Sequence, residues 1–177
     1  ASQHLLARGI PPAQIAFGGD SAGGNLALVT LMRARDEGLP LPSCGFMFSP
    51  VTDLSLSSAS AHVNQHQDVL FSVPAGDFIG ANYLSDAAEV DNPWVSPLKG
   101  DLHGLPPLLL QASDTEMLAD EARCFAERVR GGGGQAEFSA WRDLPHVFQL
   151  ASFLTEAAQA LQEVSAFVHR STDNAKR

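Results

Sequence analysis

The stretch that decides the fold is Gly18-Gly19-Asp20-Ser21-Ala22-Gly23-Gly24-Asn25. It follows a short apolar run and opens a segment with helical apolar periodicity, so it predicts a strand, a tight turn and a helix. Within it, Gly19-x-Ser21-x-Gly23 is the pattern of a nucleophile elbow, a strained turn that exposes the serine hydroxyl. A side chain at either glycine is expected to collide with the neighbouring strand or helix. The next amide, that of Ala22, lies at a helix N-terminus and can donate to an oxyanion.

The composition predicts one ordinary domain, or most of one. The 177 residues are 45% hydrophobic and 18% charged, which is enough to bury a core. The 11 basic against 20 acidic side chains give a net charge of −9, which argues against nucleic acid as a partner. Cys44 and Cys124 each lie in an apolar run and are predicted to be reduced core residues, which favours the cytoplasm. The apolar stretches are shorter than the about 20 residues that span a bilayer, and nothing resembles a signal peptide.

Strands and helices alternate along the chain. Strands are predicted over residues 15–17, 44–48, 105–111 and 135–141, and helices over residues 2–8, 26–35, 74–84, 118–129 and 150–168, with a frayed tail after Arg170. Residues 49–73 are polar without clear periodicity and are predicted to form an irregular excursion. The alternation predicts a parallel α/β sheet, which binds ligands beyond the carboxyl ends of its strands.

Three reactive groups each follow a predicted strand and therefore fall on the same sheet edge. They are Ser21, a carboxylate loop with Asp114 and Glu116, and His146. A serine needs a base within hydrogen-bonding reach, and that base needs a third group to orient it. The order serine, acid, histidine is the one expected of α/β-hydrolases. At this point the acid is either Asp114 or Glu116.

The chain resembles the C-terminal part of a hormone-sensitive-lipase-like esterase of the α/β-hydrolase superfamily, over nearly its whole length. The matching stretches are Gly19-Asp20-Ser21-Ala22-Gly23-Gly24-Asn25-Leu26-Ala27, Ser49-Pro50-Val51-Thr52-Asp53-Leu54, Ser96-Pro97-Leu98, Leu105-Pro106-Pro107 and Pro145-His146-Val147-Phe148. The resemblance implies an α/β-hydrolase fold, with residues 1–177 as the C-terminal part of a single catalytic domain. It also implies hydrolysis of short-chain acyl esters through an acyl-enzyme, without a metal or an organic cofactor.

The resemblance also bears on the acid. The family motif Asp-Pro-Leu-x-Asp-Glu superposes on Glu116-Met117-Leu118-Ala119-Asp120-Glu121, which places Glu116 at the acid position and leaves Asp114 as the alternative. Asp20 is expected to support the turn beside the serine. Asp120 and Glu121 are expected to lie solvated in the first turns of a helix, where negative charge suits the helix dipole.

His62 and His66 raise the alternative of a metal site. Four residues are about one helical turn, so the two imidazoles could face the same way on a helix. No cysteine or well-spaced carboxylate motif accompanies them, and solvated surface histidines are common. We therefore predict no metal site.

One part of the family's catalytic machinery has no counterpart in the sequence. The family takes further oxyanion donors from a His-Gly-Gly-Gly-type loop well before the elbow, and Gly131–Gly134 cannot replace it because they come after the acid. The chain opens in mid-helix, so we hypothesise that it is a fragment of a longer esterase that lacks the N-terminal strands and cap. An exposed sheet edge would then favour self-association into a homo-oligomer.

Other functions stay open beside the esterase. A non-catalytic ligand-binding relative would keep the fold, and the presence of Ser21, an acid and His146 argues against it. A purely structural role would give no reason for three reactive groups at three strand ends. An acyltransferase or lactonase would use the same triad and differ in the acceptor. The expected partner is a small acyl-ester substrate.

Overall fold

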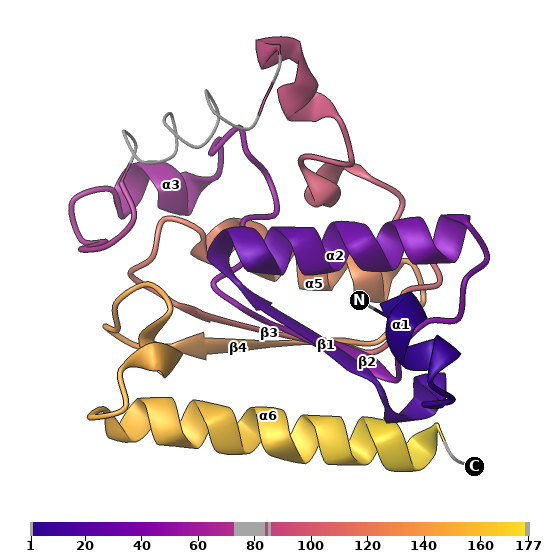
Figure 1. Cartoon of the computed structure of the whole chain (residues 1–177). Coiled ribbons are helices and arrows are strands. Elements are labelled where there is room, and N and C mark those ends of the chain that lie inside the picture. Colours follow the sequence, from indigo (N-terminus) through magenta and orange to yellow (C-terminus); the bar gives the residue numbers. More distant parts are fainter. Residues whose placement is uncertain (1, 73–83, 85, 176–177) are drawn as a thin grey trace.

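The computed structural model describes residues 2–72, 84 and 86–175 and is shown in Figure 1. The helices and strands are α1 (Ser2–Ala7), β1 (Ala16–Asp20), α2 (Ser21–Asp36), β2 (Cys44–Phe48), α3 (Ala59–Val63), β3 (Leu108–Ser113), α5 (Ala119–Gly131), β4 (Ala136–Trp141) and α6 (Thr155–Asn174). Short 3-10 helices connect them: η1 (Pro12–Gln14), η2 (Ala87–Asp91), η3 (Pro97–Lys99) and η4 (Phe148–Leu150). The helix predicted over residues 74–84 lies, apart from Leu84, outside the described residues.

The four strands form one parallel sheet whose spatial order, β1-β2-β3-β4, is also their order in the sequence. The register pairs Asp20 with Phe48, and Phe48 with Gln111. The carboxyl ends of the strands therefore meet at one edge of the sheet, on the left in Figure 1, together with the start of α2 and the loop after β4. The parallel α/β prediction is confirmed.

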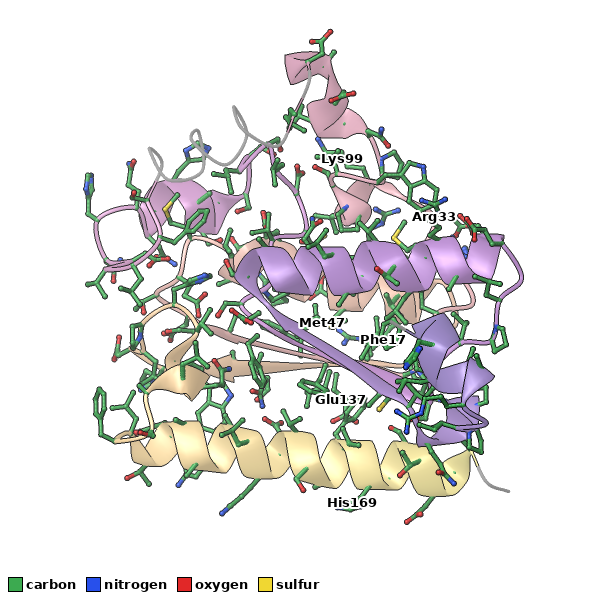
Figure 2. All side chains as sticks on the ribbon, viewed as in Figure 1. Phe17, Arg33, Met47, Lys99, Glu137 and His169 are labelled. Atoms are coloured by element: carbon green, nitrogen blue, oxygen red, sulfur yellow. The ribbon has the colours of Figure 1, made fainter. Side chains whose placement is uncertain are left out.

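Helices cover both faces of the sheet in three layers, with α2 and α5 on one face and α6 on the other (Figure 1). The α2/α5 side holds the larger core, in which Leu28, Leu31 and Met47 are buried with Leu108, Leu110 and Phe125. Figure 2 shows Met47 and Phe17 between α2 and the sheet. On the α6 side, Val164 and Phe167 pack against Cys44 and Leu109. Every residue of β3 is buried, as expected of a central strand covered on both faces.

Several predicted boundaries were wrong. β3 begins at Leu108 rather than residue 105 and reaches Ser113. α6 begins at Thr155, so Leu150 and Phe153, which are 76% and 86% exposed, precede it, and it continues past Arg170 to Asn174. Residues 49–72 form the expected irregular excursion, interrupted by the short helix α3.

Cys124 corrects a further prediction. It is exposed on α5, because the buried face of that helix runs through Ala122, Phe125 and Val129 and leaves residue 124 on the outer side. Cys44 is buried as predicted. In the part of the chain that the structure describes, no helix combines the length and the apolar character needed to cross a membrane.

Candidate active site

Ser21 is the first residue of α2 and stands directly after β1. Its φ of 50° lies in the left-handed region, which is strained for a non-glycine residue and is typical of functional sites. Gly19 is required by this turn, because a Cβ there would lie 2.3 Å from the carbonyl oxygen of Gly23. The expected collision at Gly23 is wrong: its nearest atom, in Asp20, would be 3.9 Å away. The tight second position is Gly24, where a Cβ would lie 2.8 Å from Pro50.

The structure brings Ser21, His146 and Glu116 into one hydrogen-bonded line. Nε2 of His146 is 2.9 Å from Oγ of Ser21, and Nδ1 of the same ring is 2.8 Å from Oε2 of Glu116. Glu116 is fully buried and His146 is 9% exposed. Such a line can pass the serine proton to the imidazole while the carboxylate holds the ring in the required tautomer.

The second carboxylate oxygen of Glu116 is also occupied. The backbone N–H of Ser113 donates to Oε1 at 2.7 Å, and the hydroxyl of Ser49 donates to it at 2.8 Å. Nδ2 of Asn64 donates to the backbone oxygens of both Asp114 and Glu116 at 2.9 Å. The acid-bearing loop is thus tied to the end of β2 and to the segment after α3.

Asp114, the alternative acid, contacts a different part of the histidine loop. It is exposed, and its Oδ1 accepts from the backbone N–H of Asp143 at 3.0 Å. Oγ of Ser113 accepts from the backbone N–H of Leu144 at 3.0 Å. These contacts hold the loop that carries His146, whereas the hydrogen bond to the imidazole itself comes from Glu116.

An aromatic ring covers the imidazole. The centroids of Phe71 and His146 are 5.5 Å apart at a tilt of 42°, and Phe71 is only 6% exposed. Asp68 fixes the chain there, since its carboxylate accepts from the backbone N–H groups of Phe71 at 2.9 Å and of Met117 at 3.1 Å. The excursion after β2 therefore contributes an apolar wall to the site.

Ala22, the predicted oxyanion donor, is the second residue of α2. The first N–H groups of a helix have no acceptor within the helix, so this amide can donate to an anion at the serine. Asp20 is exposed, and its side chain makes no capping hydrogen bond to α2, so the expected support of the turn by this carboxylate is not seen.

Asn25 ties two loops to the base of the site, a role that its place in the glycine-rich stretch did not reveal. It is buried, and its Nδ2 donates at 2.8 Å to the backbone oxygens of both Val51 and Val95. The backbone N–H of Val51 in turn donates to the carbonyl oxygen of Ser21 at 3.2 Å.

Glu121 contradicts the prediction that it is solvated. It is 2% exposed, and its Oε1 accepts from the backbone N–H groups of Thr52 at 2.8 Å and of Asp53 at 3.4 Å. Burial raises the pKa of this carboxyl to about 8, although the two backbone donors act in the opposite direction. Asp120 is partly exposed, pairs with Arg123 and accepts from the N–H of Ser60.

His62 and His66 are both exposed, and α3 ends at Val63, so the two do not share a helix as a paired ligand site would require. Within residues 2–72, 84 and 86–175, no group of three or more histidine, cysteine, aspartate or glutamate side chains could hold a metal ion.

Comparison with known proteins places the chain in a family. A family model described as alpha/beta hydrolase fold matches residues 1–150. The chain is 37% identical over 166 residues to an esterase of Acinetobacter venetianus, a match that covers 93% of the chain and 55% of the relative. It is 34% identical over 173 residues to an acetyl-hydrolase of Streptomyces hygroscopicus, covering 97% of the chain and 58% of the relative.

A solved structure agrees closely with the fold. The crystal structure of an esterase from the bacterial hormone-sensitive lipase family superposes with a TM-score of 0.93 at 38% identity, over 97% of this chain and 58% of that one. The chain thus spans little more than half the length of these relatives. On the strength of the family model, the chain belongs to the alpha/beta-hydrolase fold family, and along nearly all its residues it is similar to a member of the bacterial hormone-sensitive lipase family.

Proposed function

We propose that the protein is a serine carboxylesterase that acts on short-chain acyl esters, with Ser21 as nucleophile, His146 as general base and Glu116 as the acid of the triad. The observation that carries the proposal is the continuous line of hydrogen bonds from Oγ of Ser21 through the imidazole to Oε2 of Glu116. The strained φ of Ser21 and the glycine turn around it support the same assignment.

In the proposed reaction, Oγ of Ser21 attacks the ester carbonyl carbon while Nε2 of His146 takes its proton. The C–O bond to the alcohol then breaks, and the alcohol leaves with that proton. Water then attacks the acyl-serine and gives a proton to His146. This proton passes to Oγ of Ser21 as the carboxylic acid product is released. Glu116 stabilises the imidazolium in both steps, and the N–H of Ala22 supplies one donor to the oxyanion.

The substrate class rests on relatives and on the chemistry of the site. Relatives of the chain are named esterase and acetyl-hydrolase, which favours a small acyl group. The reaction needs no metal or organic cofactor, because the triad supplies nucleophile, base and acid. The partner is a small acyl ester, and the cytoplasm remains the predicted compartment.

Covalent labelling with a fluorophosphonate probe, on the protein as it is natively expressed, tests the nucleophile. We expect the label on the peptide that contains Ser21, and no label after Ser21→Ala. The exposed serine variant Ser57→Ala is the matched control and should label like the wild type. A folded protein whose Ser21 stays unlabelled would instead be a ligand-binding relative.

Hydrolysis of p-nitrophenyl esters from acetate to palmitate tests the substrate class. We expect the highest kcat/KM at short chains, and a maximum at long chains would make the protein a lipase. Repeating the assay with an added alcohol separates hydrolysis from acyl transfer, because a transferase would release mainly the new ester. A set of lactones tests the remaining alternative.

A further inference from the structure

Ser49 contacts both the acid and the histidine loop, and the triad mechanism does not use it. It follows β2 directly, is fully buried and has a φ of 45°. Its Oγ lies 2.8 Å from Oε1 of Glu116 and 3.1 Å from the backbone N of Val147, the residue after His146.

The direction of both hydrogen bonds follows from the groups involved. The backbone N–H of Val147 can only donate, so Oγ of Ser49 accepts there. An ionised carboxylate can only accept, so the one hydroxyl proton of Ser49 points to Oε1 of Glu116. The N–H of Ser113 donates to the same oxygen, and the imidazole donates to the other. Three donors therefore fix the orientation of the carboxylate.

The histidine loop has a particular need of such a contact. Val147 has a φ of 53°, and a β-branched residue in the left-handed region costs about 1–3 kcal/mol unless its surroundings hold it. The hydrogen bond from its N–H to Ser49 is one of the contacts that hold it. A single buried hydroxyl therefore spans the acid and the backbone beside the base.

We propose that Ser49 is a positioning residue of the esterase site: it fixes the carboxylate of Glu116 and the backbone beside His146 in one arrangement, so that the imidazole stays in line with Ser21. The inference rests on the proposed function. Ser49 does not touch the reacting atoms and acts through Glu116 and His146.

A merely structural role would look different in kinetics. A buried hydroxyl that only satisfies its hydrogen bonds affects stability, with no special dependence on Glu116. A positioning hydroxyl affects the chemical step, so kcat falls while KM is kept. Its effect becomes much smaller when the carboxylate it positions is removed, because only its contact with the backbone beside His146 is then left.

The test compares Ser49→Ala, Glu116→Ala and the double variant in the natively expressed protein, with p-nitrophenyl acetate as substrate. We expect Ser49→Ala to lower kcat by about 10–100-fold with KM changed by less than about 2-fold. In the Glu116→Ala background, Ser49→Ala should change kcat by less than about 3-fold.

Two further variants keep the test decisive. Ser43→Ala removes a buried serine hydroxyl at the other end of β2, where it donates to the backbone oxygen of Ile15 at 2.9 Å, and should leave kcat within about 2-fold of the wild type. Ser49→Gly removes the same hydroxyl as Ser49→Ala but relieves the strain at φ 45°, so it should fold even if the alanine variant does not and should show the same loss of kcat.

The outcomes separate this inference from the proposed function. An active wild type whose Ser49 variants keep kcat within about 3-fold overturns the positioning role alone, and so does a loss of equal size in the Glu116→Ala background. A folded wild type that neither hydrolyses the esters nor takes the fluorophosphonate label overturns both.

Discussion

At the level of single residues, the carboxylates of Glu116 and Asp114 bond to different parts of the histidine loop. Glu116 contacts the imidazole, whereas Asp114 contacts the backbone of Asp143. We predict that Glu116→Ala lowers kcat by about 10³–10⁴-fold, because the imidazole loses the group that orients it. Asp114→Ala should stay within about 10-fold of the wild type, because it loosens the loop without removing a member of the triad. The measurement is kcat with p-nitrophenyl acetate.

Asp114→Asn is the control for this pair, since its side-chain oxygen can still accept from the N–H of Asp143. Orders of magnitude lost in Asp114→Ala, with near-normal turnover in Glu116→Ala, would show that the acid is Asp114.

The sequence could predict the position of those site residues that directly follow a strand, because the ends of parallel strands meet at one end of the sheet. Ser21, Glu116 and His146 each follow a strand, so their meeting at one edge was predictable, while their catalytic roles stay predictions. Ser49 also directly follows a strand, so its position at the site was predictable in the same way, although it was not among the predicted site residues. Glu121 carried no such signal, because its burial depends on residues 51–53 folding across α5, a contact between segments about 70 positions apart.

At the level of elements, the two motif glycines of the turn between β1 and α2 differ in the space available for a side chain. We predict that Gly19→Ala lowers the free energy of unfolding by about 3 kcal/mol or more, because its Cβ would lie 2.3 Å from the carbonyl oxygen of Gly23. Gly23→Ala should raise that free energy by up to about 1 kcal/mol, since alanine is the better helix former and has space. Urea unfolding measures both, and a destabilised Gly23→Ala would contradict the asymmetry.

Helix α2 also holds the loops above it through Asn25. We predict that Asn25→Ala lowers the free energy of unfolding by about 2–4 kcal/mol, because the carbonyl oxygens of Val51 and Val95 each lose a buried donor. Thr30→Ala is the control on the same helix: its exposed hydroxyl donates to the backbone oxygen of Leu26 within the helix, so a change below about 0.5 kcal/mol is expected. Equal effects of the two substitutions in thermal unfolding would refute the role of Asn25.

The four strands and the helices α1, α2, α5 and α6 were predictable, whereas the short helix α3 and some boundaries were not. Apolar residues continue at helical spacing through Leu150 and Leu154, as they would in a single helix. Spacing alone does not show which of these side chains pack against the core. The turn at Val147 and η4 direct the chain so that Leu150 and Phe153 stay exposed, and α6 starts only at Thr155. The turn also includes a hydrogen bond from the backbone N–H of Val147 to Oγ of Ser49, which joins segments 98 positions apart and so cannot be predicted from local periodicity.

At the level of the whole molecule, Glu121 links stability to pH. Its pKa is about 8 in the folded chain against 4.5 as the ordinary value. Below pH 4.5 both states hold the proton; between pH 4.5 and 8 only the folded state does. The free energy of unfolding should therefore fall as pH rises through this window, by up to about 1.4 kcal/mol per pH unit from this group.

Glu121→Gln should remove that slope, since an amide does not ionise and still offers an oxygen to the N–H of Thr52. The measurement is urea unfolding of both proteins at a series of pH values from 5 to 9. Glu127→Gln, an exposed position on α5, should run parallel to the wild type. If the difference between wild type and Glu121→Gln is independent of pH, the buried carboxyl does not couple to folding.

The strand order of the sheet has a consequence for synthesis. Because β1, β2, β3 and β4 lie side by side in the order in which the ribosome releases them, each new strand can add to the edge of those already made. Ser21, Ser49 and Glu116 can thus be in place before His146, on the loop after β4, leaves the exit tunnel. We expect the serine of a nascent chain to become reactive only after His146 has emerged, when the imidazole reaches a carboxylate that is already in position.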